Sequence, residues 1–178
     1  AKTGHWHVVT FNRLVNVQFA IGPDGGDAGR HALFESNEVV LSPSAGKPSI
    51  YVFGSDWLMY RNNRVWSDKE AVLLNFEDGY NSNPYTHRTI VVTNNTMYSS
   101  VAAWSRFITT NLGVNTTVAA DWVVWNNIFS APNCTDTINT LIFRLRSLSA
   151  STPVLLSNFN SWRVPNIPSP FSDQSSQM

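Results

Sequence analysis

The hydrophobic period of the chain changes between residues 116 and 162, from one that fits a strand to one that fits a helix. Residues 119–129 are mostly β-branched or aromatic, and Trp122, Val124 and Ile128 share one parity. Strict alternation of this kind is typical of a strand with one buried face. We therefore expect one long strand here, and any fold must join it to a segment of helical period.

Two helices are expected after this strand. Thr135 precedes an acidic residue and an apolar stripe at helical spacing, which predicts a helix over 135–149. Thr152 and Pro153 suit the N-cap and the first position of a second helix, which we expect over 153–162. The stripe of the first helix consists of Ile138, Leu141, Ile142, Leu145 and Leu148.

The first half of the chain favours strands. Residues 1–22 contain two alternating segments that Asn12 and Arg13 would join as a tight hairpin. Residues 31–130 are expected to form the main sheet, with insertions near 56–80, where helix and strand fit equally, and near 95–117, where a short helix fits. We find no internal repeat, and the Pro/Ser-rich residues 165–178 are expected to form a tail.

Composition narrows the range of possible functions. The chain has 178 residues, which predicts one domain, and its formal net charge is zero, so bulk charge cannot hold nucleic acid. One cysteine, Cys134, excludes an internal disulfide, and His5 and His7 lack a third metal ligand nearby. No leader and no apolar run of about 20 residues is found. No motif supports catalysis, so we predict a non-enzyme with no cofactor and no metal.

A sheet followed by two terminal helices is an α+β fold in which the helices barely cover the sheet. Helices that reach across to a second copy would complete its core and give an isologous dimer. The residues expected at this dimer interface are Ile138, Leu141, Ile142, Leu145, Leu148, Leu155 and Phe159.

The order of these elements, with Ala120-Asp121 in the long strand and Thr152-Pro153-Val154 opening the second helix, resembles the coat proteins of the single-stranded RNA bacteriophages, the leviviruses. The resemblance is best over residues 85–162. It implies an antiparallel sheet with an N-terminal hairpin and two C-terminal helices packed on the partner subunit. It also implies a homodimer that assembles in the bacterial cytoplasm into an icosahedral shell around genomic RNA, without a membrane.

In that family the sheet face opposite the helices binds RNA, including a hairpin whose binding represses translation. Alternation places Ile50, Val52, Ile90, Val92, Trp122 and Val124 on the helix side. The opposite face offers Tyr51 and Trp125 for stacking on unpaired bases, and polar side chains that bind base edges. The expected RNA-binding residues are Lys47, Ser49, Tyr51, His87, Thr89, Thr93, Asp121, Trp125 and Asn127.

Two other classes fit part of the sequence. A carbohydrate-binding β-sandwich would explain seven Trp residues and low charge, and it predicts Trp in exposed loops rather than at core parity, and no terminal helices. The coat protein of another small virus, a helical plant virus, would share the excess of Arg over Lys, but it needs a four-helix bundle.

Overall fold

The computed structural model describes residues 6–15, 19–21, 29–41, 50–53, 55–68, 72–77, 79–80, 83–84, 87–102, 105–111, 121–135, 141–145, 155–164 and 171–173. Within these ranges the chain is all β and contains no α-helix. The predicted α+β class is therefore wrong.

Eighteen of the strands form three parallel sheets of six strands each. Sheet A contains β1 (Trp6–Thr10), β4 (Gly29–Glu35), β7 (Ser55–Arg61), β12 (His87–Thr93), β15 (Asp121–Trp125) and β18 (Leu155–Asn158). Sheet B contains β2 (Arg13–Val15), β5 (Glu38–Leu41), β8 (Arg64–Ser67), β13 (Thr96–Ser99), β16 (Ile128–Ser130) and β19 (Ser161–Arg163). Sheet C contains β3 (Phe19–Ile21), β6 (Ile50–Phe53), β9 (Val72–Glu77), β14 (Arg106–Asn111), β17 (Leu141–Leu145) and β20 (Phe171–Asp173). The short strands β10 (Gly79–Tyr80) and β11 (Asn83–Pro84) pair with each other, antiparallel.

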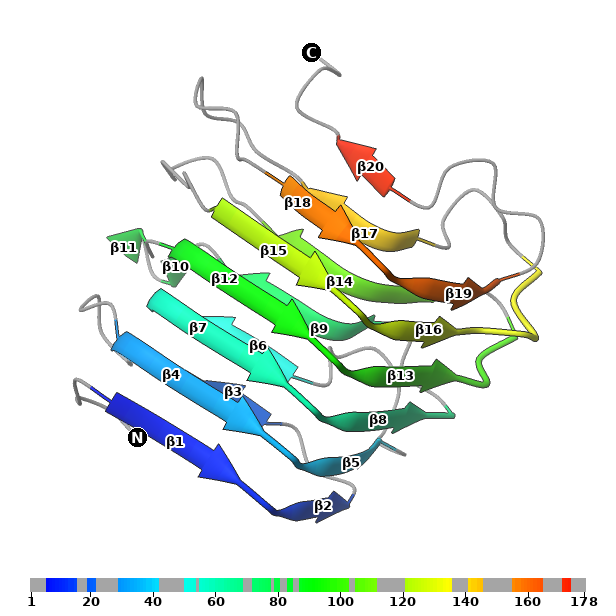
Figure 1. Cartoon of the computed structure of the whole chain (residues 1–178), viewed down its shortest axis with the longest axis horizontal. Helices are drawn as coiled ribbons and strands as arrows, with labels where there is room; N and C mark the ends of the chain where they lie inside the picture. Colours follow the sequence, from blue (N-terminus) through cyan, green and yellow to red (C-terminus); the bar gives the residue numbers. More distant parts are fainter. Residues whose placement is uncertain are drawn as a thin grey trace.

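The chain visits sheets A, B and C in turn, and each such passage is one coil of a parallel β-helix. Figure 1 shows sheets A and B side by side in front and sheet C behind them, with the coils stacked from β1 to β18. Each strand of a sheet pairs only with the corresponding strands of the coils before and after it. A solenoid of this kind is built from nearest-neighbour contacts.

The core lies between the three sheets, and side-chain parity decides what enters it. In sheet A the inward positions of β12 and β15 hold Ile90, Val92, Trp122 and Val124, all at most 1% exposed. Sheet C contributes Ile50 and Val52, both fully buried. The parity predicted for these six residues is confirmed, but they pack inside a β-helix and not under helices.

A two-residue corner joins sheet A to sheet B in every coil. Its first residue has a left-handed backbone, with φ between 52° and 57°, and its second residue is Asn. The six corners are Phe11-Asn12, Ser36-Asn37, Asn62-Asn63, Asn94-Asn95, Asn126-Asn127 and Phe159-Asn160. A single left-handed residue turns the chain sharply, which is why each coil bends there without a longer loop.

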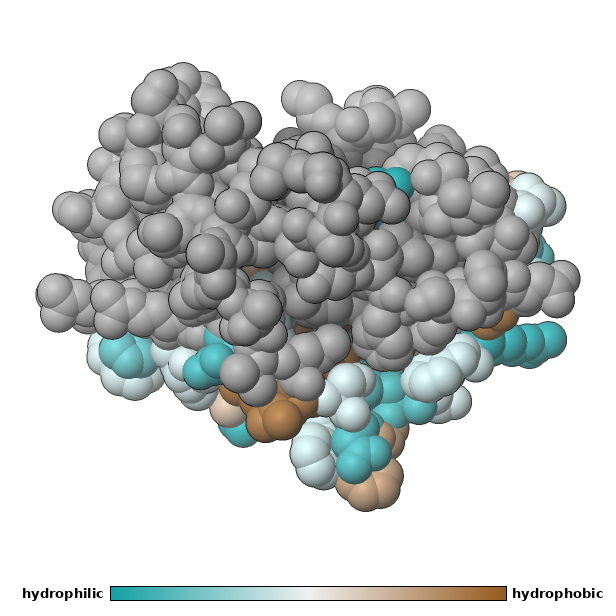
Figure 2. All heavy atoms as spheres, turned by 90° about the horizontal axis from the view of Figure 1, so that it is seen from above, coloured by the Kyte–Doolittle hydropathy of each residue, from teal (hydrophilic) through white to brown (hydrophobic). Residues whose placement is uncertain are grey.

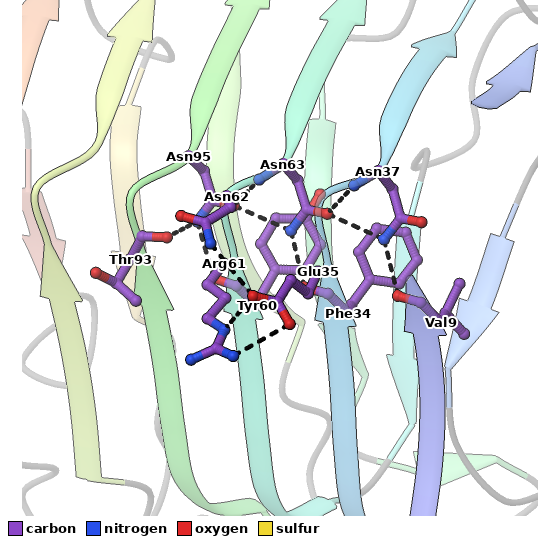
Figure 3. A network of polar contacts seen from close by, with 10 residues as sticks. All are labelled: Val9, Phe34, Glu35, Asn37, Tyr60, Arg61, Asn62, Asn63, Thr93 and Asn95. Carbon is purple, nitrogen blue, oxygen red and sulfur yellow. Dashed lines mark hydrogen bonds and ion pairs between the residues drawn. The ribbon is translucent and has the colours of Figure 1, made fainter. Parts of the chain in front are cut away.

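The corner asparagines form a hydrogen-bonded ladder along the molecule (Figure 3). The Oδ1 atom of Asn63 accepts the backbone N–H of Asn37 at 2.9 Å, and its Nδ2 donates to the carbonyl of Phe34 at 2.9 Å. In the next coil, the Oδ1 atom of Asn95 accepts the backbone N–H of Asn63, and its Nδ2 donates to the carbonyl of Tyr60. The ladder fixes the register of sheets A and B, because each amide satisfies backbone groups of the preceding coil.

Several local predictions are corrected by this architecture. Instead of pairing as a hairpin over residues 1–22, β1 and β2 pair in parallel with β4 and β5. The predicted helix over 135–149 contains β17 at its described residues, and β18 and β19 lie where the helix over 153–162 was expected. These segments are strands because each finds a neighbouring strand in the coil before it, a pairing that the chain's local period does not reveal.

The expected long strand over 119–129 is two strands, β15 and β16, separated by the corner at Asn126-Asn127. In the undecided region 56–80 the described elements are the strands β7, β8, β9 and β10, and the short helix expected within 95–117 is replaced by β14 at its described residues. No described helix is long and apolar enough to cross a membrane.

An internal repeat is present, contrary to the sequence-based expectation. The ladder asparagines are 25, 26, 32, 32 and 33 residues apart. The signal was a corner dipeptide ending in Asn, followed by alternating apolar residues, at a spacing typical of solenoids. Uneven coil lengths concealed it.

Candidate ligand-binding groove

A groove of about 500 Å³ lies on the outer face of sheet B, across β5, β8 and β13. Eight of the described residues line it: Glu38, Val39, Val40, Arg64, Val65, Trp66, Thr96 and Tyr98. It therefore crosses three consecutive coils. Concave sites lined by aromatic side chains and a few polar groups are the usual form of ligand sites.

Two aromatic rings form the wall of the groove. Trp66 and Tyr98 are neighbours in the register of β8 and β13, and their ring centroids are 4.3 Å apart at an interplanar angle of 38°. Alternation turns them outward, because Val65 and Met97 occupy the adjacent inward positions of the same strands. Trp66 is 53% exposed, although a ring of this size would be expected to bury more of its surface.

A polar row runs beside the aromatic pair. Register places Glu38 next to Arg64, and Arg64 next to Thr96, one strand apart in each case. Glu38 forms an ion pair with Arg13 Nε at 3.4 Å, on the N-terminal side of the groove. Arg64 makes no ion pair with a described residue, so its guanidinium is available to a ligand. The groove thus places a carboxylate, a guanidinium and a hydroxyl within reach of the rings.

The outer face of sheet A carries different chemistry. Trp6 stacks on His31 with centroids 4.2 Å apart, and an aliphatic row that includes Leu33, Met59 and Val91 runs beside them. Arg61 and Glu35 form an ion pair on this face, with Nε and Oε1 2.7 Å apart and a hydrogen bond from Nη2 to Oε2 at 3.1 Å. Arg61 and Glu35 are thus paired with each other and are not directed at a ligand.

Four of the predicted RNA-binding residues share this outer face of sheet A. Thr89 is next to Asp121 in the register, and Thr93 is next to Trp125. His87 also lies in β12, whereas Tyr51 lies in β6 of sheet C. Asn127 is buried in the ladder and does not join that face, and Lys47 and Ser49 lie outside the described residues. The predicted surface is therefore brought together only in part.

The predicted interface residues do not form one helical stripe. Leu141, Ile142 and Leu145 lie in β17, and Leu155 lies in β18. Phe159 occupies an exposed corner. Ile138 and Leu148 lie outside the described residues.

The groove residues Trp66 and Tyr98 were missed by the sequence analysis. Their signal was the alternation in Arg64-Val65-Trp66-Ser67 and Thr96-Met97-Tyr98-Ser99, which puts an aromatic ring at the same outward position after two successive corners. Without the repeat, the two segments have no common register. Among the described residues no group of three or more His, Cys, Asp or Glu could hold a metal ion.

Comparisons of the chain with protein-family models, with curated proteins and with solved structures found no match.

Proposed function

We propose that this protein is a glycan-binding β-helix that holds an oligosaccharide segment in the groove of sheet B. The observation that carries the proposal is the pair of the exposed Trp66 and the half-buried Tyr98, beside Glu38, Arg64 and Thr96. The proposal concerns the class of ligand, a chain of sugar rings, and the place where it binds.

The chemistry of a sugar ring matches this arrangement. One face of a pyranose is lined by C–H groups, which pack on the electron-rich face of an aromatic ring, as cations and other positively polarised groups do. Its hydroxyls both donate and accept hydrogen bonds, so a carboxylate and a guanidinium can hold the same ring from its edge. Glu38 accepts such bonds and Arg64 donates them.

The groove favours binding without hydrolysis. Glycoside hydrolysis generally uses two carboxyl groups that flank the scissile bond. Among the described residues that line the groove, Glu38 is the one carboxylate. We therefore propose a binding protein, and the absence of enzymatic activity stays a prediction.

Two features were expected of a carbohydrate-binding protein, Trp in exposed loops rather than at core parity and the lack of terminal helices. Trp6, Trp66, Trp125 and Trp162 are at least 39% exposed, but they lie in strands, and Trp122 is in the core. The described C-terminal residues are strands. The exposed rings and the terminal strands support the glycan proposal, although the fold is a solenoid and not a sandwich. The phage coat function stays a prediction, and the α+β architecture on which it rested is contradicted.

Titration of the protein with a panel of neutral and uronic-acid oligosaccharides, followed by tryptophan fluorescence and calorimetry, tests the proposal. Trp66→Ala should weaken the binding of the best oligosaccharide at least about tenfold, since it removes the stacking ring. Trp125→Ala, an exposed Trp on sheet A, is the matched control and should leave that affinity unchanged.

The same two variants are titrated with single-stranded RNA. If RNA binds and only Trp125→Ala weakens it, the predicted RNA-binding surface on sheet A is supported, and the glycan proposal is then decided by the oligosaccharide titrations alone. If no oligosaccharide binds, or both variants weaken it equally, the groove is not a glycan site.

A further inference from the structure

We propose that copies of this chain associate head to tail, with the last coil of one copy stacked on the first coil of the next. The partner is a second copy of the same chain, and the contact continues sheets A and B from one molecule into the other. The inference rests on the two ends of the β-helix and is independent of the groove.

The asparagine ladder has a direction. In each rung the Oδ1 atom accepts the backbone N–H and the Nδ2–H of the asparagine one coil earlier, as Asn160 does for Asn127 at 2.9 and 3.0 Å. At the last rung the backbone N–H of Asn160 has no acceptor among the described residues, and at the first rung the Oδ1 atom of Asn12 accepts no hydrogen bond from them. The Asn160 end therefore offers an N–H donor, and the Asn12 end offers the oxygen acceptor that this donor needs.

The strand edges are complementary in the same way. Among the described strands, β1 pairs only with β4 and β2 only with β5, while β18 pairs only with β15 and β19 only with β16. An open strand edge presents unpaired N–H and C=O groups to another chain. The internal register, in which the residue after each corner asparagine aligns with its counterpart, would place Arg13 of the next copy beside Ser161.

The corner row gives a second, independent reason. Its middle members are Ser36, Asn62, Asn94 and Asn126, but its first and last members are Phe11 and Phe159, which are 82% and 67% exposed. A bulky residue with positive φ is uncommon, whereas Asn is enriched there. Neighbours in this row touch, since Asn126 Nδ2 donates to Asn94 Oδ1 at 2.6 Å.

Head-to-tail stacking would therefore bring Phe159 of one copy against Phe11 of the next. Apolar side chains gather at both ends: Trp6 and Val8 are also exposed on β1, and Leu156 on β18. Figure 2 views the molecule from the end where β18 lies, and along the lower margin of that view, where described residues are visible, hydrophobic atoms lie beside hydrophilic ones. A contact between two different surfaces that does not close on itself produces open linear assemblies.

Sedimentation velocity of the full chain over a range of concentrations tests this association. The wild-type weight-average sedimentation coefficient should rise with concentration without reaching a dimer plateau. Phe11→Asp and Phe159→Asp, which each disable one end, should separately weaken association at least about tenfold, because each loses the aromatic contact. Both exposed corners accept Asp, a residue that tolerates a left-handed backbone.

An equimolar mixture of these two variants retains one intact pair of ends, so it should form a one-to-one dimer and stop there. Asn94→Asp adds the same charge to the same row in the middle of the molecule, and it should associate like the wild type. A wild-type chain that stays monomeric at every concentration would overturn the proposal. So would variants that associate as the wild type does, since the contact would then lie elsewhere.

Discussion

At each corner between sheets A and B, one asparagine side chain replaces the strand partner that the turn removes. Asn63, for example, binds one backbone N–H and one backbone carbonyl of the preceding coil, and it is 1% exposed. A buried backbone group without a hydrogen bond is expensive, so the corner depends on this amide.

Asn63→Ala should therefore lower the free energy of unfolding by about 3 kcal/mol, since two buried backbone groups lose their partners at roughly 1–3 kcal/mol each. Asn12→Ala is the control, because the Oδ1 atom of Asn12 accepts no hydrogen bond from a described residue. It should change the free energy of unfolding by less than about 1 kcal/mol. Urea denaturation measures both, and equal losses would contradict the directional ladder.

Tyr60, unlike the corner asparagines, buries a polar group that no described residue satisfies. Its ring stacks on Phe34 with centroids 5.1 Å apart, but its buried hydroxyl has no hydrogen-bond partner among the described residues. Burial raises the pKa of the Tyr60 phenol above its ordinary value of 10.0. The folded protein therefore keeps this proton at a pH where the unfolded chain loses it.

This difference predicts a pH-dependent stability. Below pH 10 the phenol is protonated in both the folded and the unfolded state, so it does not change the free energy of unfolding with pH. Above pH 10 the unfolded state ionises and the free energy of unfolding declines by about 1.4 kcal/mol per pH unit. Tyr60→Phe should lack this decline and should be as stable as the wild type, or more so, at pH 8. Urea denaturation of both proteins at pH 8 and pH 11 checks this, and parallel losses in the two would show that Tyr60 ionises in the folded state.

At the scale of single elements, β12 separates an inner from an outer face by one residue. Val92 is fully buried in the core, whereas Val91 lies on the aliphatic row outside sheet A. Both strand neighbours, β7 and β15, are present on either side, so the backbone setting of the two valines is the same.

Val92→Thr should lower the thermal midpoint clearly, because it buries a hydroxyl in an apolar core at a cost of about 1–3 kcal/mol. Val91→Thr should change the free energy of unfolding by no more than about 0.5 kcal/mol. Differential scanning calorimetry compares the two. A larger loss of stability in the Val91 variant would mean that the outer face of sheet A is covered.

The strands β12, β15 and β17 show what sequence alone could predict. The parity of Ile90, Val92, Trp122 and Val124 was right, because alternation is a local property of a strand. Around β17, apolar residues at 138, 141, 142 and 145 also matched a helical period, and nothing local arbitrates between the two in so short a segment. Its strand partners β14 and β20 lie far away in the sequence.

The larger error was in predicting which strands pair, and the same error concealed the groove residues. A hairpin between β1 and β2 is the natural reading of adjacent strands, yet each pairs with the next coil. Trp66 and Tyr98 are 32 residues apart and become neighbours only when the chain is wound into coils. The groove residues therefore come together only through the winding of the chain, and no single segment contains them all.

For the whole molecule, the coiled path separates two roles in space. The groove lies on the middle coils, across β5, β8 and β13, while the surfaces proposed to associate lie on the first and last coils. Stacking of copies would leave every groove open and would repeat it along one line. A ligand with many similar sugar units would then meet many equivalent sites.

The winding also determines how the chain must reach its native state. Every pairing in sheets A, B and C joins segments about one coil apart, and the ladder bonds span 25 to 33 residues. No strand of these sheets can pair until the next coil has been closed, so loop-closure entropy opposes every early step. We expect folding in seconds and not microseconds, with a growing edge that stays exposed until the last coil docks. The open edge that lets a coil add to its neighbour is also the edge at which incomplete chains would aggregate.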